Sequence, residues 1–242
     1  MKYLLLTLLT ALTLTSCDSQ RSATTPETDA TATTPETGTI PEDQLAGGIS
    51  IATLDSRYPE ATKAYFAGGC FWCTEASFDR IQGVIDVYSG YAGGDLPNPT
   101  YADSNTKTSG HAEAIVVYYD PEVITYDKLL DVFFTAHDPT QLNRQGPDVG
   151  PQYRSAIFPL NDEQEQQARA KIDALNASGK FDQQIATTIE DPIQFWVAEE
   201  YHQDYYEDPS NPNQGYVQNV SRPKVEKVMQ EFQDILKPEY QQ

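Results

Sequence analysis

Two cysteines lie three residues apart in the stretch GGCFWCTEASF, residues 68–78. The glycine pair lets the backbone turn sharply, and the mixed polar and apolar spacing that follows predicts a helix from Phe71. Cys70 would then lie at a helix N-terminus, where unpaired amide groups and the helix dipole favour a thiolate. Cys73 would follow one turn later on the same face, close enough to form a disulfide with Cys70. Cys70 is therefore the candidate nucleophile.

Three chemistries are open to this cysteine pair. A structural disulfide is one, although so short a loop gives little entropic stabilisation. Half of a metal site is another, but the chain has no second CxxC motif and only 3 histidines. A redox-active dithiol without a metal fits the spacing and the position best.

A carboxylate interrupts an apolar strand further along the chain. Residues 111–119, HAEAIVVYY, carry apolar side chains at both parities, which predicts a strand buried on both faces. Glu113 would share a face with Ile115 and Val117, where burial raises the pKa of a carboxyl group and lets it hold a proton at neutral pH. The alternative is a glutamate at the strand end whose carboxylate reaches solvent, and the pattern favours neither.

The elements that must position these residues alternate irregularly. The sequence predicts short strands at residues 63–67, 83–88, 111–119, 154–158 and 184–190. It predicts helices from residue 71 and at residues 125–136, 162–178, 195–206 and 224–236. Residues 91–110 and 137–153 read as long loops, which are often functional. This pattern is typical of an α+β two-layer sandwich rather than a doubly wound sheet.

The beginning of the chain is typical of a secretory signal. The apolar run from Tyr3 to Leu14 is too short to cross a bilayer of roughly 30 Å as a helix. Small residues before Cys17 resemble a bacterial lipoprotein processing site. Cleavage there would remove residues 1–16 and leave a lipid on Cys17; an ordinary signal peptide, with Cys17 incidental, is the alternative.

A low-complexity segment follows Cys17. Thr, Ser, Pro and acidic residues dominate residues 18–50, and ATTPET occurs twice, at residues 23–28 and 32–37. We expect residues 17–57 to be a disordered tether that holds a folded domain, residues 58–242, clear of a membrane. The expected location is the bacterial cell envelope, outside the cytoplasm, where thiols can be oxidised.

The formal net charge of the chain is −20. A surface this acidic repels the phosphates of nucleic acids and the headgroups of anionic lipids. Nucleic acid is therefore excluded as a partner, and a membrane would be reached through the lipid alone.

Several blocks together resemble the A-type peptide methionine sulfoxide reductases. These blocks are GGCFWCTEASF, GYAGGDLPNPTY, GHAEAIVVYYDP, HDPTQLNRQGPDVGPQYRSAIF and AEEYHQDYY. The resemblance covers about residues 60–222. It implies a mixed sheet with a ferredoxin-like core and long functional loops. It also implies a monomer, without a bound cofactor, that reduces methionine S-sulfoxide, free or in proteins, and so repairs oxidised extracytoplasmic proteins.

The resemblance assigns a role to residues of the first block. Cys70 corresponds to the nucleophile that attacks the sulfoxide sulfur. Phe71 and Trp72 correspond to the apolar pocket that holds the methyl group of the substrate. The attack leaves a sulfenic acid on Cys70, which a nearby thiol can convert to a disulfide.

The resemblance also assigns the polar residues. Glu113 corresponds to the acid that acts on the sulfoxide oxygen, with Tyr101 and Tyr153 as hydrogen-bonding partners. Asp148 belongs to the same polar cluster. A sulfoxide becomes a good target for a thiol when its oxygen gains a proton or strong hydrogen bonds, which this set of residues would supply.

Cys73 marks a departure from many relatives, which have glycine at this position and carry recycling cysteines near the C-terminus. Residues 220–242 contain no cysteine. Our hypothesis is that Cys73 resolves the Cys70 sulfenic acid as a disulfide. A thioredoxin-like dithiol, or dithiothreitol in vitro, would reopen it.

Two other functions use fewer of these residues. A membrane-tethered thiol–disulfide oxidoreductase of thioredoxin type would explain the cysteine pair, but it gives no role to Glu113 or to the two tyrosines. A surface lipoprotein that binds a ligand or an adhesion partner would need the cysteines only for structure.

Overall fold

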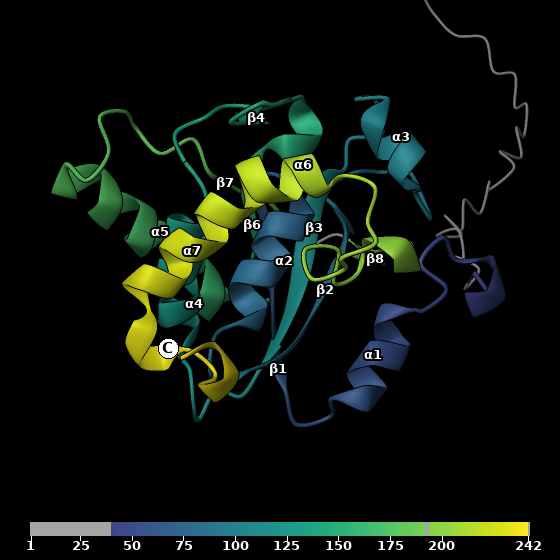
Figure 1. Ribbon diagram of the computed structural model, residues 1–242, viewed down its shortest axis with the longest axis horizontal. Coiled ribbons are helices and arrows are strands. Elements are labelled where there is room, and N and C mark those ends of the chain that lie inside the picture. Colours follow the sequence, from purple (N-terminus) through teal and green to yellow (C-terminus); the bar gives the residue numbers. More distant parts are fainter. Residues whose placement is uncertain (1–39, 192–193, 242) are drawn as a thin grey trace, which may run out of the picture. The chain divides into compact units, whose positions relative to one another are not determined.

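A mixed sheet of six strands lies at the centre of the molecule (Figure 1). The structure is a computed structural model that describes residues 40–191 and 194–241. The strand order is β7-β6-β1-β3-β2-β8, and every neighbouring pair is antiparallel except β6 and β7. The strands are β1 (Thr62–Gly68), β2 (Val84–Ala92), β3 (Ala112–Tyr119), β6 (Ser155–Phe158), β7 (Thr188–Ile189) and β8 (Trp196–Val197).

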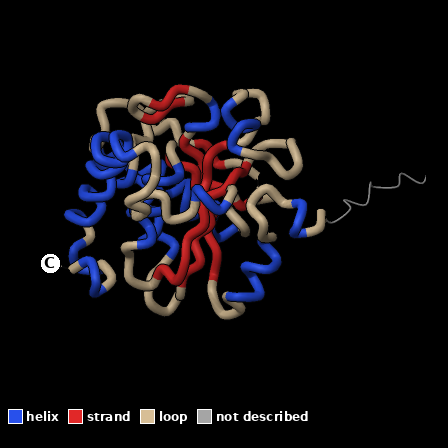
Figure 2. Tube along the Cα trace, turned by 45° about the vertical axis from the view of Figure 1, so that its right-hand side comes forward, coloured by secondary structure: helices blue, strands red, loops and turns tan. Residues whose placement is uncertain are grey.

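The four central strands have the connectivity of a ferredoxin-like fold. The chain runs β1, α2 (Phe71–Asp79), β2, β3, α4 (Tyr126–Ala136) and then β6. Helices α5 (Asp162–Ser178) and α7 (Arg222–Glu231) pack against α4, and α7 also packs against α2. Figure 2 shows most helices on one side of the strands. The predicted α+β sandwich with a ferredoxin-like core is confirmed.

Strand β3 is buried along its whole length, as its two-sided apolar pattern predicted. Ile115 and Val117 face the core cluster formed with α2 and α4. Ala114 and Val116 face a second cluster on the other side of the sheet, which contains Leu54. The polar atoms of a side chain on this strand are therefore remote from bulk water.

The folded part begins earlier than predicted. Helix α1 (Ile51–Arg57) forms within the expected tether, preceded by a 3₁₀ turn, η1 (Glu42–Gln44). Ser50 caps α1, because its hydroxyl accepts from the backbone N–H of Thr53 at 3.1 Å, and Leu54 is fully buried against the sheet. The prediction of a disordered tether is therefore wrong for residues 51–57. Cys17 and the predicted signal peptide lie outside the described residues.

Several other elements match their prediction, and one does not. Helix α5 has the predicted bounds, and Thr125 caps α4 through a hydrogen bond from the Lys128 amide. The prediction of a helix at residues 195–206 is wrong, because no α-helix forms there. That segment instead forms β8, the edge strand that pairs with β2, and the 3₁₀ turn η3 (Glu200–His202).

The two long loops contain short elements that the sequence did not predict. Helix α3 (Tyr101–Asn105) begins at a capping box made by Thr100 and Asp103. The second loop contains the hairpin of β4 (Arg144–Gln145) and β5 (Asp148–Val149), followed by the 3₁₀ turn η2 (Pro151–Tyr153).

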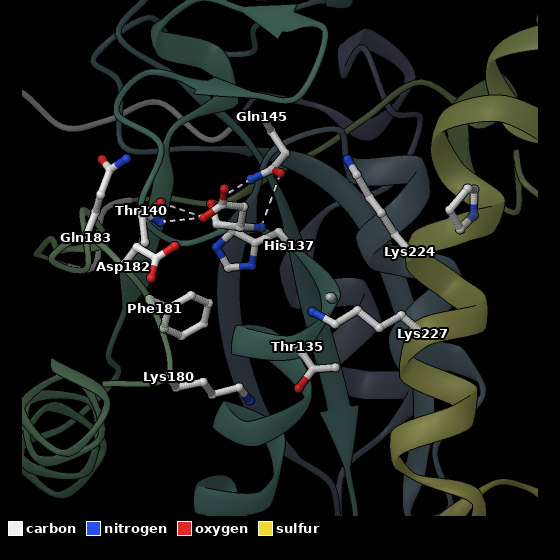
Figure 3. Close-up of a pocket in the computed structure, with 13 residues that line it drawn as sticks. Thr135, His137, Thr140, Gln145, Lys180, Phe181, Asp182, Gln183, Lys224 and Lys227 are labelled. Carbon is white, nitrogen blue, oxygen red and sulfur yellow. Dashed lines mark hydrogen bonds between the residues drawn. The ribbon is translucent and has the colours of Figure 1, made fainter. Parts of the chain in front are cut away.

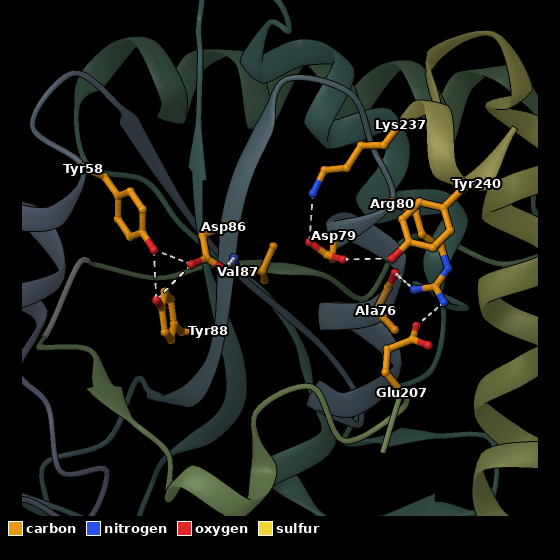
Figure 4. Close-up of polar contacts among 10 residues, drawn as sticks. All are labelled: Tyr58, Ala76, Asp79, Arg80, Asp86, Val87, Tyr88, Glu207, Lys237 and Tyr240. Atoms are coloured by element: carbon orange, nitrogen blue, oxygen red, sulfur yellow. Dashed lines mark hydrogen bonds and ion pairs between the residues drawn. The ribbon is translucent and has the colours of Figure 1, made fainter. Parts of the chain in front are cut away.

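The C-terminal segment fastens α7 to the end of α2. Helix α6 (Gln214–Tyr216) leads through a π-helical turn, η4 (Val217–Ser221), into α7, and η5 (Gln233–Ile235) and η6 (Pro238–Tyr240) follow. Lys237 forms an ion pair with Asp79 at 2.9 Å, and the Arg80 guanidinium lies against the ring of Tyr240 (Figure 4). Side chains of α7 are thereby held close to α2. In the described part of the chain, no helix is long and apolar enough to span a membrane.

Candidate active site

The predicted site residues gather at one end of the sheet, where α3, β4 and α6 lie together at the top of Figure 1. A cavity of about 210 Å³ opens there. Its walls are formed by Cys70, Trp72, Tyr101, Glu113, Asp148, Tyr153, Asn213 and Tyr216. Six of these eight residues were predicted from the sequence.

The turn from β1 into α2 places Cys70 in this cavity. Gly69 adopts a φ of +88°, and a Cβ at this position would lie 2.5 Å from the Cβ of Gln145, so only glycine fits. Cys70 follows as the N-cap of α2, with 4% of its surface exposed. The predicted strand-to-helix turn is confirmed.

Glu113 is buried in the cavity wall, with 1% of its surface exposed. The interpretation of Glu113 as a buried carboxyl group is therefore correct, and the alternative of a strand-end glutamate that reaches solvent is not. The backbone N–H of Phe71, in the first turn of α2, donates to Glu113 Oε2 at 3.1 Å. Burial raises the pKa of the Glu113 carboxyl well above its usual range, although this hydrogen bond opposes the shift. Glu113 can therefore enter a reaction as a neutral proton donor.

Two phenols face the same space as Glu113. Burial raises the pKa of Tyr101 to about 12, and it raises the pKa of Tyr153 further. Both hydroxyl groups are therefore protonated donors at neutral pH. Glu199 holds Tyr101 in position, because one of its carboxylate oxygens accepts from the Tyr101 backbone N–H and the other from the Tyr91 hydroxyl, each at 2.9 Å.

The apolar side of the cavity is formed by Trp72. Its indole stacks on Tyr205 with a centroid distance of 3.8 Å, and its Nε1 donates to Nδ1 of His202 at 3.1 Å. Burial lowers the pKa of His202 to about 4, so this imidazole is neutral and can accept the bond. Phe71 does not line the cavity. Its ring lies behind the wall, against Tyr101 and His202, so its place in the methyl pocket stays a prediction.

The sequence did not identify Tyr216 and Asn213. The Tyr216 hydroxyl donates to Asp148 Oδ2 at 2.5 Å. Asn213 Nδ2 donates to the Tyr205 hydroxyl at 2.7 Å. Both residues belong to an irregular polar segment before α7, and no local pattern separates them from other loop residues.

The pKa values of the two buried thiols shift in opposite directions. Burial raises the pKa of Cys70, and the hydrogen bond and the charge of Cys73 raise it further. The hydrogen bond from Cys70 lowers the pKa of Cys73 to about 7, helped by the charge of Lys224 and by Ser221. Of the two sulfurs, Cys73 is therefore the more easily ionised in the unliganded site. The helix N-terminus does not outweigh the desolvation of Cys70.

This arrangement suits one type of reaction. A neutral carboxyl group and protonated phenols surround a space in which a ligand oxygen would be bound, and a thiol lies beside the atom that carries this oxygen. Donors fixed in a dry cavity can stabilise charge that develops on such an oxygen. The thiol can then attack the neighbouring atom while the bond to oxygen weakens.

Comparisons with known proteins agree with this chemistry. The family model described as peptide methionine sulfoxide reductase matches residues 62–236. The peptide methionine sulfoxide reductase MsrA of Deinococcus radiodurans is 53% identical over 175 residues, which are 72% of this chain and 84% of that protein. MsrA 1 of Rhodopirellula baltica is 52% identical over 74% of this chain and 91% of its own length.

Solved structures show the same likeness. Methionine sulfoxide reductase A of Corynebacterium diphtheriae is similar with a TM-score of 0.55 and 34% identity, covering 63% of this chain and 77% of that one. Reduced Mxr1 from Saccharomyces cerevisiae is similar with a TM-score of 0.56 and 38% identity, covering 63% and 88%.

The protonation of Glu113 can be measured directly. In an infrared difference spectrum between the wild type and the Glu113→Gln variant, we expect the band of a protonated carboxyl group at neutral pH. The band should disappear as the pH rises through the raised pKa. Absence of this band at neutral pH would show that Glu113 is ionised.

Glu113 should also affect stability with a defined sign. The folded state keeps this proton above about pH 4.3, where the unfolded chain releases it. The free energy of unfolding of the wild type should therefore fall relative to Glu113→Gln as the pH rises, by at most about 1.4 kcal/mol per pH unit, until the folded pKa is passed. Urea titrations of both proteins measure the difference, and parallel pH profiles would contradict the account.

Proposed function

This chain belongs to the A-type peptide methionine sulfoxide reductase family, and on that premise we propose that it reduces methionine S-sulfoxide, free or in proteins, through Cys70 and Cys73. The observation that carries the proposal is the meeting of Cys70 with the buried acid Glu113 in one cavity. Disulfide exchange handles no oxygen atom, so it gives no role to the two phenols that share this cavity with Glu113. This favours the reductase over the thioredoxin-type alternative.

In the first step, the Cys70 sulfur attacks the sulfoxide sulfur while Glu113 and the two phenols donate to the oxygen. A bond forms between the two sulfurs, and the thiol proton passes to the sulfoxide oxygen. This oxygen then moves to the Cys70 sulfur, as both the S–O bond of the substrate and the temporary S–S bond break. Sulfoxide and thiol thus become methionine and a Cys70 sulfenic acid, so the substrate is reduced and the cysteine is oxidised.

The walls of the cavity support selection of one epimer. A sulfoxide sulfur carries an oxygen, a methyl group and the rest of the side chain. If the oxygen faces Glu113 and the methyl group faces Trp72, the direction of the remaining chain is fixed relative to Cys70. Only one configuration then presents its sulfur to the thiol, and the resemblance to A-type reductases indicates the S epimer.

In the second step, Cys73 resolves the intermediate. The Cys73 sulfur attacks the Cys70 sulfur, the sulfenic oxygen leaves as water, and a disulfide forms. Both cysteines are free in the structure and lie in adjacent turns at the start of α2. A thioredoxin-like dithiol then reduces the disulfide through a mixed disulfide, so no bound cofactor is needed. We propose that the enzyme acts as a monomer, as the resemblance to A-type reductases implies.

We further propose that the enzyme works in the bacterial cell envelope, anchored by a lipid on Cys17. The apolar run and the small residues before Cys17 support this location. The segment between Cys17 and η1 is rich in Thr, Pro and acidic residues and would act as a spacer. In this place the enzyme would repair proteins that are oxidised outside the cytoplasm.

A single turnover without reductant tests the two-cysteine chemistry. The wild type should release about one equivalent of methionine and become lighter by two hydrogens, as the Cys70–Cys73 disulfide forms. Cys73→Ser should release the same amount but retain a Cys70 sulfenic acid that dimedone can trap, and Cys70→Ser should release none. An unchanged steady-state rate of Cys73→Ser with a dithiol protein as reductant would exclude the resolving role.

The anchor can be tested in a bacterial host. We expect Cys17→Ala to move the protein from the membrane fraction to the soluble fraction and to abolish incorporation of labelled fatty acid. Cys73→Ser serves as the matched cysteine control and should remain in the membrane. Membrane association of Cys17→Ala equal to that of the wild type would contradict the lipoprotein assignment.

A further inference from the structure

A lysine from the C-terminal helix lies beside the second cysteine. The Nζ atom of Lys224, in the first turn of α7, is 4.0 Å from the Cys73 sulfur. The hydroxyl of Ser221, at the end of the π-helical turn before α7, is 3.2 Å from the same sulfur. Ser221 is fully buried and Lys224 is half-buried. The short segment where η4 passes into α7 therefore supplies both of these polar side chains.

The charge of Lys224 has no nearer carboxylate to neutralise it. Within residues 40–191 and 194–241, no aspartate or glutamate oxygen lies within 4.0 Å of its ammonium group. Lys237 of the same C-terminal region, in contrast, forms an ion pair with Asp79. In a chain with a net charge of −20, an unpaired lysine next to a buried thiol is an unusual placement. Its nearest candidate anion is the Cys73 sulfur.

Lys224 also borders a water-accessible hollow of about 500 Å³ (Figure 3). Lys224 and Lys227 both extend from α7 at its wall. His137 adds no positive charge there, because burial lowers its pKa to about 4. The hollow keeps the ammonium group hydrated, so the cost of placing it near the core is small, while its charge still acts on the sulfur.

The other titratable groups that face Cys73 either raise its pKa, are uncharged, or lower its pKa only before Cys70 is oxidised. Asp148 raises the pKa of Cys73 by its negative charge. Glu113 is neutral, and Tyr216 is protonated because burial raises its pKa. Cys70 stabilises the Cys73 thiolate by a hydrogen bond, but this bond is lost once Cys70 carries oxygen. Once Cys70 is a sulfenic acid, Lys224 and Ser221 are the neighbours of Cys73 that still stabilise its thiolate.

We propose that Lys224, assisted by the Ser221 hydroxyl, is a positioning residue for the resolving step, which keeps Cys73 as a thiolate aimed at the Cys70 sulfenic acid. The inference rests on the proposed role of Cys73 as the resolving thiol. In the step, the Cys73 thiolate forms the S–S bond, and the Cys70–O bond breaks. The oxygen leaves as water after it gains a proton. The lysine stays protonated throughout and acts only through the sulfur.

The test compares Lys224→Met with Lys227→Met. Both substitutions remove one positive charge from α7 at the same hollow, but only Lys224 contacts Cys73. Thiolate absorbance in the ultraviolet reports the titration of Cys73 in the reduced proteins. We expect its midpoint to rise in Lys224→Met and to stay near neutral pH in Lys227→Met.

The resolving step is then followed in a single turnover by acid quenching and mass measurement. If the pKa of Cys73 moves from about 7 toward the ordinary cysteine value of about 8.5, disulfide formation at neutral pH should slow by about threefold to fifteenfold. The rate should recover at alkaline pH, and Lys224→Arg should restore most of it. Methionine release in the same turnover should match that of Lys227→Met.

The outcomes separate the two levels of the proposal. If the wild type forms no Cys70–Cys73 disulfide, the proposed function of Cys73 fails. If the wild type forms it, but Lys224→Met has the same thiolate titration and the same resolving rate as Lys227→Met, only the role of Lys224 is overturned. The titration is measured on the reduced protein at rest, so it remains informative even if a variant turns over slowly.

Discussion

The carboxyl group of Glu113 is buried at the start of β3, a strand that is covered on both faces. The chemistry of the cavity depends on the loss of water around this group. A carboxylate there would be far less stable than the neutral acid, so the site stores a proton at neutral pH. The amide of Phe71 fixes the position of the group. Because burial also keeps Tyr101 and Tyr153 protonated, the cavity presents converging donors to any oxygen that enters it.

The same burial controls the thiols. Lys224 and Ser221 lie beside the Cys73 sulfur, and they stabilise a negative charge there better than on the sulfur of Cys70. Cys70 is thereby left as a thiol until a substrate with an activated oxygen arrives. The C-terminal segment, which fastens α7 to the end of α2, thus contributes to the chemistry as well as to the packing.

The sequence predicted those parts of the site whose signal is local. The two-sided apolar pattern of β3 predicted a buried strand but left open whether the Glu113 carboxyl group reaches solvent, and the glycine turn located Cys70 at the start of a helix. Tyr216 and Asn213 were missed because no local pattern marks the segment that brings them to the cavity. His202, which accepts from Trp72, lies in a segment that was misread as helical. The pKa shifts of the two thiols were also beyond the sequence. The helix terminus is visible in the sequence, whereas the desolvation of Cys70 and the approach of Lys224 depend on contacts across about 150 residues.

The central claim is that a fixed thiol, a neutral acid and an aromatic wall act together on one sulfoxide configuration. Turnover of the separated S and R epimers of a methionine sulfoxide peptide, with dithiothreitol as reductant, tests it most directly. The account predicts that the S epimer alone is reduced, and that Glu113→Gln lowers its turnover by about 100- to 10,000-fold. Equal turnover of both epimers, or no turnover of either by a folded protein with two reactive thiols, would contradict it.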